Sequence, residues 1–284
     1  MPNARLSSLS SALFSWGPLL IVMAFSGCPP HSGGTSPTGA PASDTLVPLR
    51  LITLPSELRE LSGLTLLNDS TLGAIQDERG VLYKIRLADG AVFARLKFHG
   101  PGDFEGIEQT PTALFALQSD GDVFEINGDV DDAQKYETHL TSAADTEGLA
   151  YDAQQNRLLI ACKEEPGDGY EGTRAIYAFD LDRRELQPDP TILLDRSYPG
   201  LREFKPSALA YHSPTGWWVL VSSTTQQLAA LDSEGGVQDV WSLPASVLPQ
   251  PEGLAVLPGG DLLIGSEGRP ARIARFRFPP HSAP

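Results

Sequence analysis

A short module of apolar strands recurs five times along the 284-residue chain. Each copy begins with Glu or Ser, continues with Gly or Ala and then Leu or Ile, and passes through a turn into a second apolar strand. Successive copies start roughly 40 to 60 residues apart, and a repeat of this length that carries several short strands is typical of a β-propeller. The five copies begin at Ser62, Glu105, Glu147, Ser207 and Glu252.

Further strands follow each module, because apolar residues alternate there as they do in half-buried strands. The last module leaves no room for a fourth strand, but the apolar segment 45–54 precedes the first module. We expect this segment to complete the last blade and remove an exposed sheet edge. The sequence thus predicts an all-β, five-bladed β-propeller of four-stranded blades, closed by its N-terminal strand. The third strands are predicted at 81–87, 122–126, 175–181, 227–232 and 272–278, and the fourth at 92–98, 136–140, 191–194 and 237–243.

The start of the chain has the pattern of an export signal. An apolar run at 13–25, too short to span a bilayer comfortably, ends in FSGC, which resembles a bacterial lipobox. We expect residues 1–27 to be a lipoprotein signal peptide and Cys28 to be acylated. Phe25 stands where the lipobox usually has Leu, and an ordinary secretory signal cleaved nearby is the alternative.

The remaining boundaries follow from composition. Residues 28–44 are rich in Pro, Gly and Ser without apolar periodicity, which predicts a flexible tether. The propeller is expected to span 45–279, and 280–284 to form a tail. The two cysteines are not expected to pair, and Cys162, inside an apolar strand, is predicted to be a buried, inert thiol.

The formal net charge of −15 argues against a nucleic-acid partner, which requires a basic surface. The acidic residues gather at particular strand ends. In a propeller, the first strand of each blade lines the central channel and begins on the face where the second strand ends. Carboxylates from both kinds of position therefore meet at the channel mouth, where crowding raises their pKa values unless a cation lies among them.

Calcium fits such a mouth because it takes six to eight oxygen ligands in irregular geometry, whereas zinc prefers His or Cys. No His occupies the equivalent positions. We expect a calcium ion with ligands among Glu105, Glu147, Glu252, Glu164 and Glu267. The alternative is a rim of ion pairs, because basic residues share this face. Together with one further acid, these basic residues form a possible ligand face: Asp77, Arg79, Lys163, Lys205 and Arg269.

The motifs SGL, EGIE, EGLAY, SALAY and EGLAV, with ACKEE at 161–165 and GSEG at 265–268, resemble the SdiA-regulated (YjiK-like) proteins. The resemblance covers 46–278. It implies a five-bladed propeller, distantly similar to NHL-repeat and gluconolactonase-type propellers, with calcium bound at a shared site. Glu105, Glu147 and Glu252 match the EG positions of the family. Ala208 stands where the family usually has Gly. The family has no settled biochemical activity, so the resemblance implies a fold and an ion rather than a reaction.

From these observations we expect a monomeric, calcium-binding lipoprotein of the bacterial cell envelope, with its propeller outside the cytoplasm. The lipid anchor would be its only membrane contact, and the channel face would bind a small-molecule or protein ligand without catalysis. A metal-dependent hydrolase of the phytase-like or lactonase type is the alternative. The lactonase version is weakened because Asn68, Asn127 and Asn156 all fall in turns. A rigid scaffold without an ion is the third hypothesis.

Overall fold

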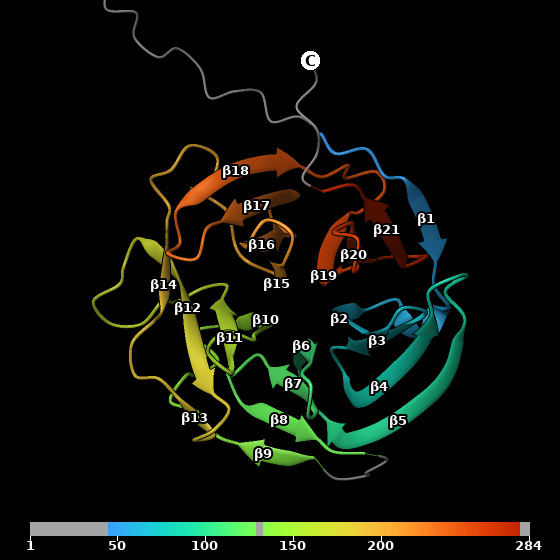
Figure 1. Ribbon diagram of the computed structural model, residues 1–284, viewed down its shortest axis with the longest axis horizontal. Helices are drawn as coiled ribbons and strands as arrows, with labels where there is room; N and C mark the ends of the chain where they lie inside the picture. The colour runs from blue at the N-terminus through green and yellow to red at the C-terminus, as the bar shows by residue number, and fades with distance from the viewer. Residues whose placement is uncertain (1–44, 129–132, 279–284) are drawn as a thin grey trace, which may run out of the picture. The chain divides into compact units, whose positions relative to one another are not determined.

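The computed structural model describes residues 45–128 and 133–278. These residues form five antiparallel sheets arranged as a ring of blades (Figure 1), which is the five-bladed propeller that the sequence predicts. Within each blade the strands follow chain order from the channel to the rim, apart from the closing strand of blade 5. The predicted signal peptide, Cys28, the tether and the C-terminal tail lie outside the described residues.

Blades 1, 2 and 4 each have four strands in consecutive order. Blade 1 contains β2 (Leu61–Asn68), β3 (Thr71–Gln76), β4 (Arg79–Arg86) and β5 (Val92–Pro101). Blade 2 contains β6 (Phe104–Gln109), β7 (Leu114–Gln118), β8 (Val123–Ile126) and β9 (Gln134–Tyr136). Blade 4 contains β15 (Ala208–His212), β16 (Trp217–Ser222), β17 (Gln227–Leu231) and β18 (Val237–Ser242).

Blade 3 divides its outermost position between two short strands. It contains β10 (Thr146–Asp152), β11 (Arg157–Cys162) and β12 (Thr173–Asp180), and both β13 (Glu185–Leu186) and β14 (Ile192–Asp195) pair with β12. The strand predicted at 191–194 is therefore confirmed as β14.

The fourth strand of blade 2 was predicted wrongly at 136–140, since β9 ends at Tyr136. The residues that follow β9 cover a turn instead of pairing. The Thr138 hydroxyl donates to the Gly121 carbonyl at 3.1 Å, and Leu140 packs against the same glycine.

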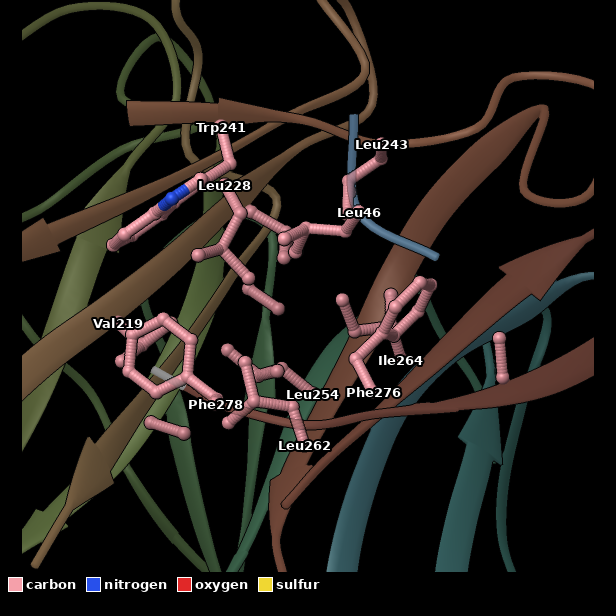
Figure 2. Close-up of a cluster of buried hydrophobic side chains, with 14 of the residues drawn as sticks. Leu46, Val219, Leu228, Trp241, Leu243, Leu254, Leu262, Ile264, Phe276 and Phe278 are labelled. Atoms are coloured by element: carbon pink, nitrogen blue, oxygen red, sulfur yellow. The ribbon is translucent and has the colours of Figure 1, made fainter. Parts of the chain in front are cut away.

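Blade 5 is closed by the N-terminal strand, as predicted. It contains β19 (Gln250–Val256), β20 (Leu262–Glu267) and β21 (Arg272–Phe276), and β1 (Arg50–Thr53) pairs antiparallel with β21. The segment before β1 also reaches blade 4, because the Leu46 backbone N–H donates to the Ser242 carbonyl at 2.9 Å. The side chain of Leu46 joins a buried apolar cluster between blades 4 and 5, with Trp241, Phe276 and Phe278 (Figure 2). Both ends of the described chain are thus fixed in one core.

Two further side chains belong to the core. Trp218 is 5% exposed and its ring centroid lies 4.8 Å from that of Tyr211, so it packs between strands instead of forming a ligand platform. Cys162 is fully buried, and burial raises the pKa of its thiol to about 12, as expected of an inert cysteine.

The helical structure of the described residues is one 3-10 turn, η1 (Ser56–Leu58). Within those residues, no helix has the length and apolar character needed to cross a bilayer.

Candidate functional site

The three glutamates of the repeat are placed by β-bulges. In blades 2, 3 and 5, the ladder between the first and second strands skips one residue, which is Glu105, Glu147 or Glu252, and in blade 1 it skips Ser62 in the same way. A bulge leaves the extra residue unpaired and redirects its side chain, and bulges often occur beside functional sites. All three glutamates line a common cavity at the centre of the ring. The sequence-based expectation that they converge on the channel is met.

The small residue after each glutamate allows the inner strands to approach closely. A Cβ atom added to Gly106 would lie 2.7 Å from Leu149 Cβ, and one added to Gly148 would lie 3.0 Å from Leu209 Cβ. Both contacts are to the inner strand of the next blade. Glycine is therefore required here by packing around a narrow axis.

The next residue of each module narrows the channel. Five apolar side chains, one per blade, line the same cavity as the glutamates and are almost fully buried. The cavity measures about 10 Å³, roughly the space of one water-sized sphere. A ligand larger than water or a bare ion therefore has no passage through this part of the channel. These five side chains are Leu64, Ile107, Leu149, Leu209 and Leu254.

Burial shifts the protonation of the three glutamates. It raises the pKa of Glu105 to about 9, with a further contribution from the charge of Glu147. Burial also raises the pKa of Glu252 well above its usual range, and the neighbouring Glu267 adds charge repulsion and a carboxyl–carboxyl hydrogen bond. For Glu147, burial raises the pKa to about 7, while Lys163 acts in the opposite direction. The mouth is thus a place where negative charge is costly.

Lys163 supplies one positive charge to this cluster. Its ammonium group binds Glu147 Oε1 and lies 3.9 Å from Asp145 Oδ2. The other carboxylate oxygen of Glu147, Oε2, is buried and has no hydrogen-bond partner. Lys163 therefore balances Glu147, while the raised pKa values of Glu105 and Glu252 keep those two carboxyls protonated near neutral pH.

The residues at the ends of the second strands have different surroundings. Glu267 lies beside Glu252, as expected of a mouth residue. Glu164 instead forms an ion pair with Lys205. Burial raises the pKa of Asp77 to about 6, with contributions from nearby Glu60 and Glu267, and its Oδ1 has no hydrogen-bond partner. Arg79 and Arg269 make no ion pair with any described residue. The alternative of an ion-paired rim therefore applies to Lys163 and Lys205 only.

In two blades, serine replaces the glutamate and has a structural role. The Ser62 hydroxyl donates to the Phe104 carbonyl at 2.6 Å, and the Ser207 hydroxyl donates to the Pro251 carbonyl at 2.7 Å. Each serine thus binds the residue just before the glutamate of the next blade. Sequence reasoning missed these contacts and the bulges, because neither leaves a mark on the apolar pattern.

A hollow of about 440 Å³ opens beside the mouth. Its lining includes Ala144 and Glu165, which adjoin the mouth residues Asp145 and Glu164 in sequence, and the side chains of Tyr170 and Tyr177. Across the described residues, no group of three or more His, Cys, Asp or Glu side chains is arranged to hold a metal ion.

The sequence profile of the SdiA-regulated proteins matches residues 49–277. The chain belongs to the SdiA-regulated family. No curated protein matches the sequence of this SdiA-regulated chain. Its fold is similar to that of the PQQ-bound aldose sugar dehydrogenase from Streptomyces coelicolor, with a TM-score of 0.54 and 14% identity over 84% of this chain and 99% of that one.

Glutaminyl cyclase from Myxococcus xanthus is also similar, with a TM-score of 0.56 and 16% identity over 82% of this chain and 96% of that one. At these identities, both similarities show the propeller fold of the SdiA-regulated chain and nothing of its chemistry.

Proposed function

We propose that the channel mouth binds one calcium ion and that the surrounding face recognises a ligand. The observation that carries this proposal is the buried, unpartnered Oε2 of Glu147, in a cavity that Glu105 and Glu252 also line. Buried polar groups are normally satisfied, and an exception calls for a partner. A cation would be such a partner.

The donor set suits calcium in its chemistry. Glu105, Glu147 and Glu252 offer carboxylate oxygens only, which a hard cation prefers, and Glu267 adds a fourth carboxylate next to Glu252. Lys163 would have to yield Glu147 Oε1 for that oxygen to become a ligand. A bound calcium ion would balance the negative charge of these carboxylates. Glu105, Glu147, Glu252 and Glu267 would hold it.

Thermal unfolding with and without calcium tests the proposal. A ligand that binds only the folded state stabilises it by about 2.7 kcal/mol at 100 times the dissociation constant. For a domain of this size, that corresponds to a rise in melting temperature of about 5 to 11 °C. We expect chelation to remove this gain, calcium to restore it, and magnesium to restore less, because magnesium requires a stricter octahedron.

Two substitutions sharpen the test. Glu147→Gln keeps the volume but removes one charge, so it should abolish most of the calcium-dependent rise in melting temperature. Glu171→Gln, at an exposed loop position, is the matched control and should respond to calcium like the wild type. If calcium leaves the wild-type melting temperature unchanged while Glu147→Gln melts higher than wild type, the glutamates only repel one another and the calcium proposal fails.

The hollow beside the mouth supports a ligand-binding role. Its volume of about 440 Å³ lies within the range of small-molecule sites, roughly 300 to 1,000 Å³. Tyr170 provides aromatic surface there, and Glu165, next to the mouth residue Glu164 in sequence, adds a carboxylate to the lining. A small polar molecule bound there would contact Tyr170 and Glu165.

We also propose that the protein is a lipoprotein of the cell envelope, acylated at Cys28. The support is the apolar run that ends in FSGC, followed by the tether. Cys28→Ser should release the protein from the membrane fraction, and the wild type should incorporate labelled fatty acid. A wild type that takes up no fatty acid would rule out acylation.

A further inference from the structure

The charge of the chain is divided unevenly between two sectors of the propeller. Residues 45–101 and 252–278, which supply blade 1 and blade 5 with its closing strand β1, contain 11 Lys and Arg and 9 Asp and Glu. Residues 102–251, which supply blades 2 to 4, contain 9 Lys and Arg and 26 Asp and Glu. The negative charge of the protein therefore belongs to blades 2 to 4, and the sector of blades 5 and 1 is slightly positive.

The same positive sector carries most of the exposed apolar surface. Among the described residues, six large apolar side chains are exposed, and four of them lie on β1, on the segment before it and on β5. Leu51 is 48% exposed and Phe93 is 57% exposed. Clustered exposed apolar side chains mark interaction sites more often than scattered ones do. The four are Val47, Leu49, Leu51 and Phe93.

The strands that carry these side chains lie next to one another. Arg95, on the same exposed face of β5 as Phe93, donates from Nε to Glu57 Oε2 at 2.7 Å, just after β1. Arg50 on β1 also donates to the Ala88 carbonyl in the turn before β5. We call the exposed faces of β1 and β5, with residues 47–49, the outer wall.

The outer wall carries basic side chains that form no ion pair with a described residue. Arg50 and Lys97 on the wall, and Arg277 directly after β21, are exposed, and none of them is ion-paired with a described residue. The acids of this sector that lie away from the mouth are mostly neutralised by arginine, in the ion pairs Arg86–Asp89, Arg95–Glu57 and Arg275–Asp261. The wall therefore combines unpaired cations with exposed apolar side chains.

We propose that the outer wall lies against an anionic lipid bilayer. Basic side chains near an anionic membrane each contribute attraction, and apolar side chains enter the boundary between headgroups and acyl chains. The acidic blades 2 to 4 would face away, where salt screens their repulsion within about 10 Å. β1 is also the first strand after the tether that follows Cys28. The contact adds to the proposed lipid anchor, does not require it, and is independent of calcium.

Vesicle flotation of an unanchored protein tests this contact. The chain begun at Thr45 contains every described strand and buried core residue, and its folding is checked by melting. In EDTA, we expect it to float with phosphatidylglycerol-containing vesicles, to bind purely phosphatidylcholine vesicles at least tenfold more weakly, and to dissociate in high salt. Lys97→Gln should weaken binding about fivefold, since one basic side chain is lost.

Matched variants on the acidic side are the controls. Leu51→Glu, on the outermost strand of blade 5, should weaken vesicle binding at least tenfold, whereas Leu193→Glu, on the outermost strand of blade 3 and 40% exposed, should not. Arg183→Gln is the control for Lys97→Gln. Equal effects of the paired variants would overturn the proposal. The proposal would also be overturned if the wild type did not bind vesicles but self-associated through a surface that Leu51→Glu disrupts.

A second measurement uses the full chain, in case the shortened one does not fold. In the full chain with Cys28→Ser, a thiol-reactive fluorophore is placed at Thr53→Cys on the outer wall or at Glu185→Cys in blade 3, both exposed positions, while Cys162 stays buried. In anionic vesicles, nitroxide-labelled lipid should quench the probe at 53 several-fold more than the probe at 185. Equal quenching would contradict the proposed orientation.

Discussion

Two kinds of blade meet at the channel mouth, and they use the same repeat position differently. In blades 1 and 4, Ser62 and Ser207 place their hydroxyls on carbonyls of the next blade. In blades 2, 3 and 5, glutamate occupies the position, and at Glu147 one oxygen has no partner. A satisfied polar group holds a structure together, and an unsatisfied one is available for a ligand. The comparison separates structural from candidate binding residues within a single repeat.

The serines should be the larger contributors to calcium-independent stability. Removing a buried hydroxyl leaves its acceptor unsatisfied, at a cost of about 1 to 3 kcal/mol. We expect Ser207→Ala and Ser62→Ala each to lower the free energy of unfolding by this amount, equally with calcium and with chelator. Urea unfolding measures both conditions. A loss seen only in calcium would mean that the serines belong to the ion site and would break the comparison.

A glutamate outside the mouth tests whether burial alone makes a binding site. Glu108 lies three residues beyond Glu105 on β6 and accepts hydrogen bonds from the Thr65 hydroxyl, at 3.3 Å, and from the Tyr151 backbone N–H. Burial raises its pKa from 4.5 to about 8. Because the folded state holds this proton more tightly than the unfolded state, the free energy of unfolding should fall as pH rises from about 4.5 through about 8.

Glu108→Gln should remove that part of the pH dependence. The variant should match the wild type near pH 4.5, melt several degrees higher at pH 8, and bind calcium normally. Melting curves across this pH range check the expectation. A variant that loses calcium binding would show that the ion site extends along the channel past the apolar side chains.

The rim ion pair should have the smallest effect. Lys205 and Glu164 are partly exposed, with 28% and 39% of their side-chain surface accessible, and ion pairs of this kind contribute about 0 to 1 kcal/mol. Lys205→Met should therefore shift the melting temperature by no more than about 4 °C. A much larger shift, unaffected by high salt, would place this pair among the structural contacts with the serines.

Much of the fold was predictable because it depends on pattern. Alternating apolar residues gave the strands, and the missing fourth strand of the last module led to β1. The strand predicted at 136–140 failed because Thr138 and Leu140 satisfy a turn, a role that periodicity does not reveal. The alternation of apolar residues shows which side chains are buried, but not whether they belong to a strand or cover a turn.

The candidate site was predictable in part for a different reason. Repeat position alone indicated that Glu105, Glu147 and Glu252 meet at the channel, and all three line it. Their protonation depends on distances between blades, which the sequence does not contain. The pairing of Lys163 with Glu147, and of Lys205 with Glu164, depends on side-chain reach across the mouth. Calcium, the ligand and the lipid anchor stay predictions.

The closing strand also constrains how the protein can be made. Ile52 pairs opposite Ile273, so β1 and β21 are neighbours in space at nearly the greatest sequence separation the domain allows. Contacts between residues this far apart in the sequence form slowly, because the intervening chain must be ordered first. During synthesis, β1 emerges before every other strand of the ring and finds its partner after all of them. An apolar strand therefore stays unpaired through almost the whole time of synthesis, when a holding chaperone would be most useful.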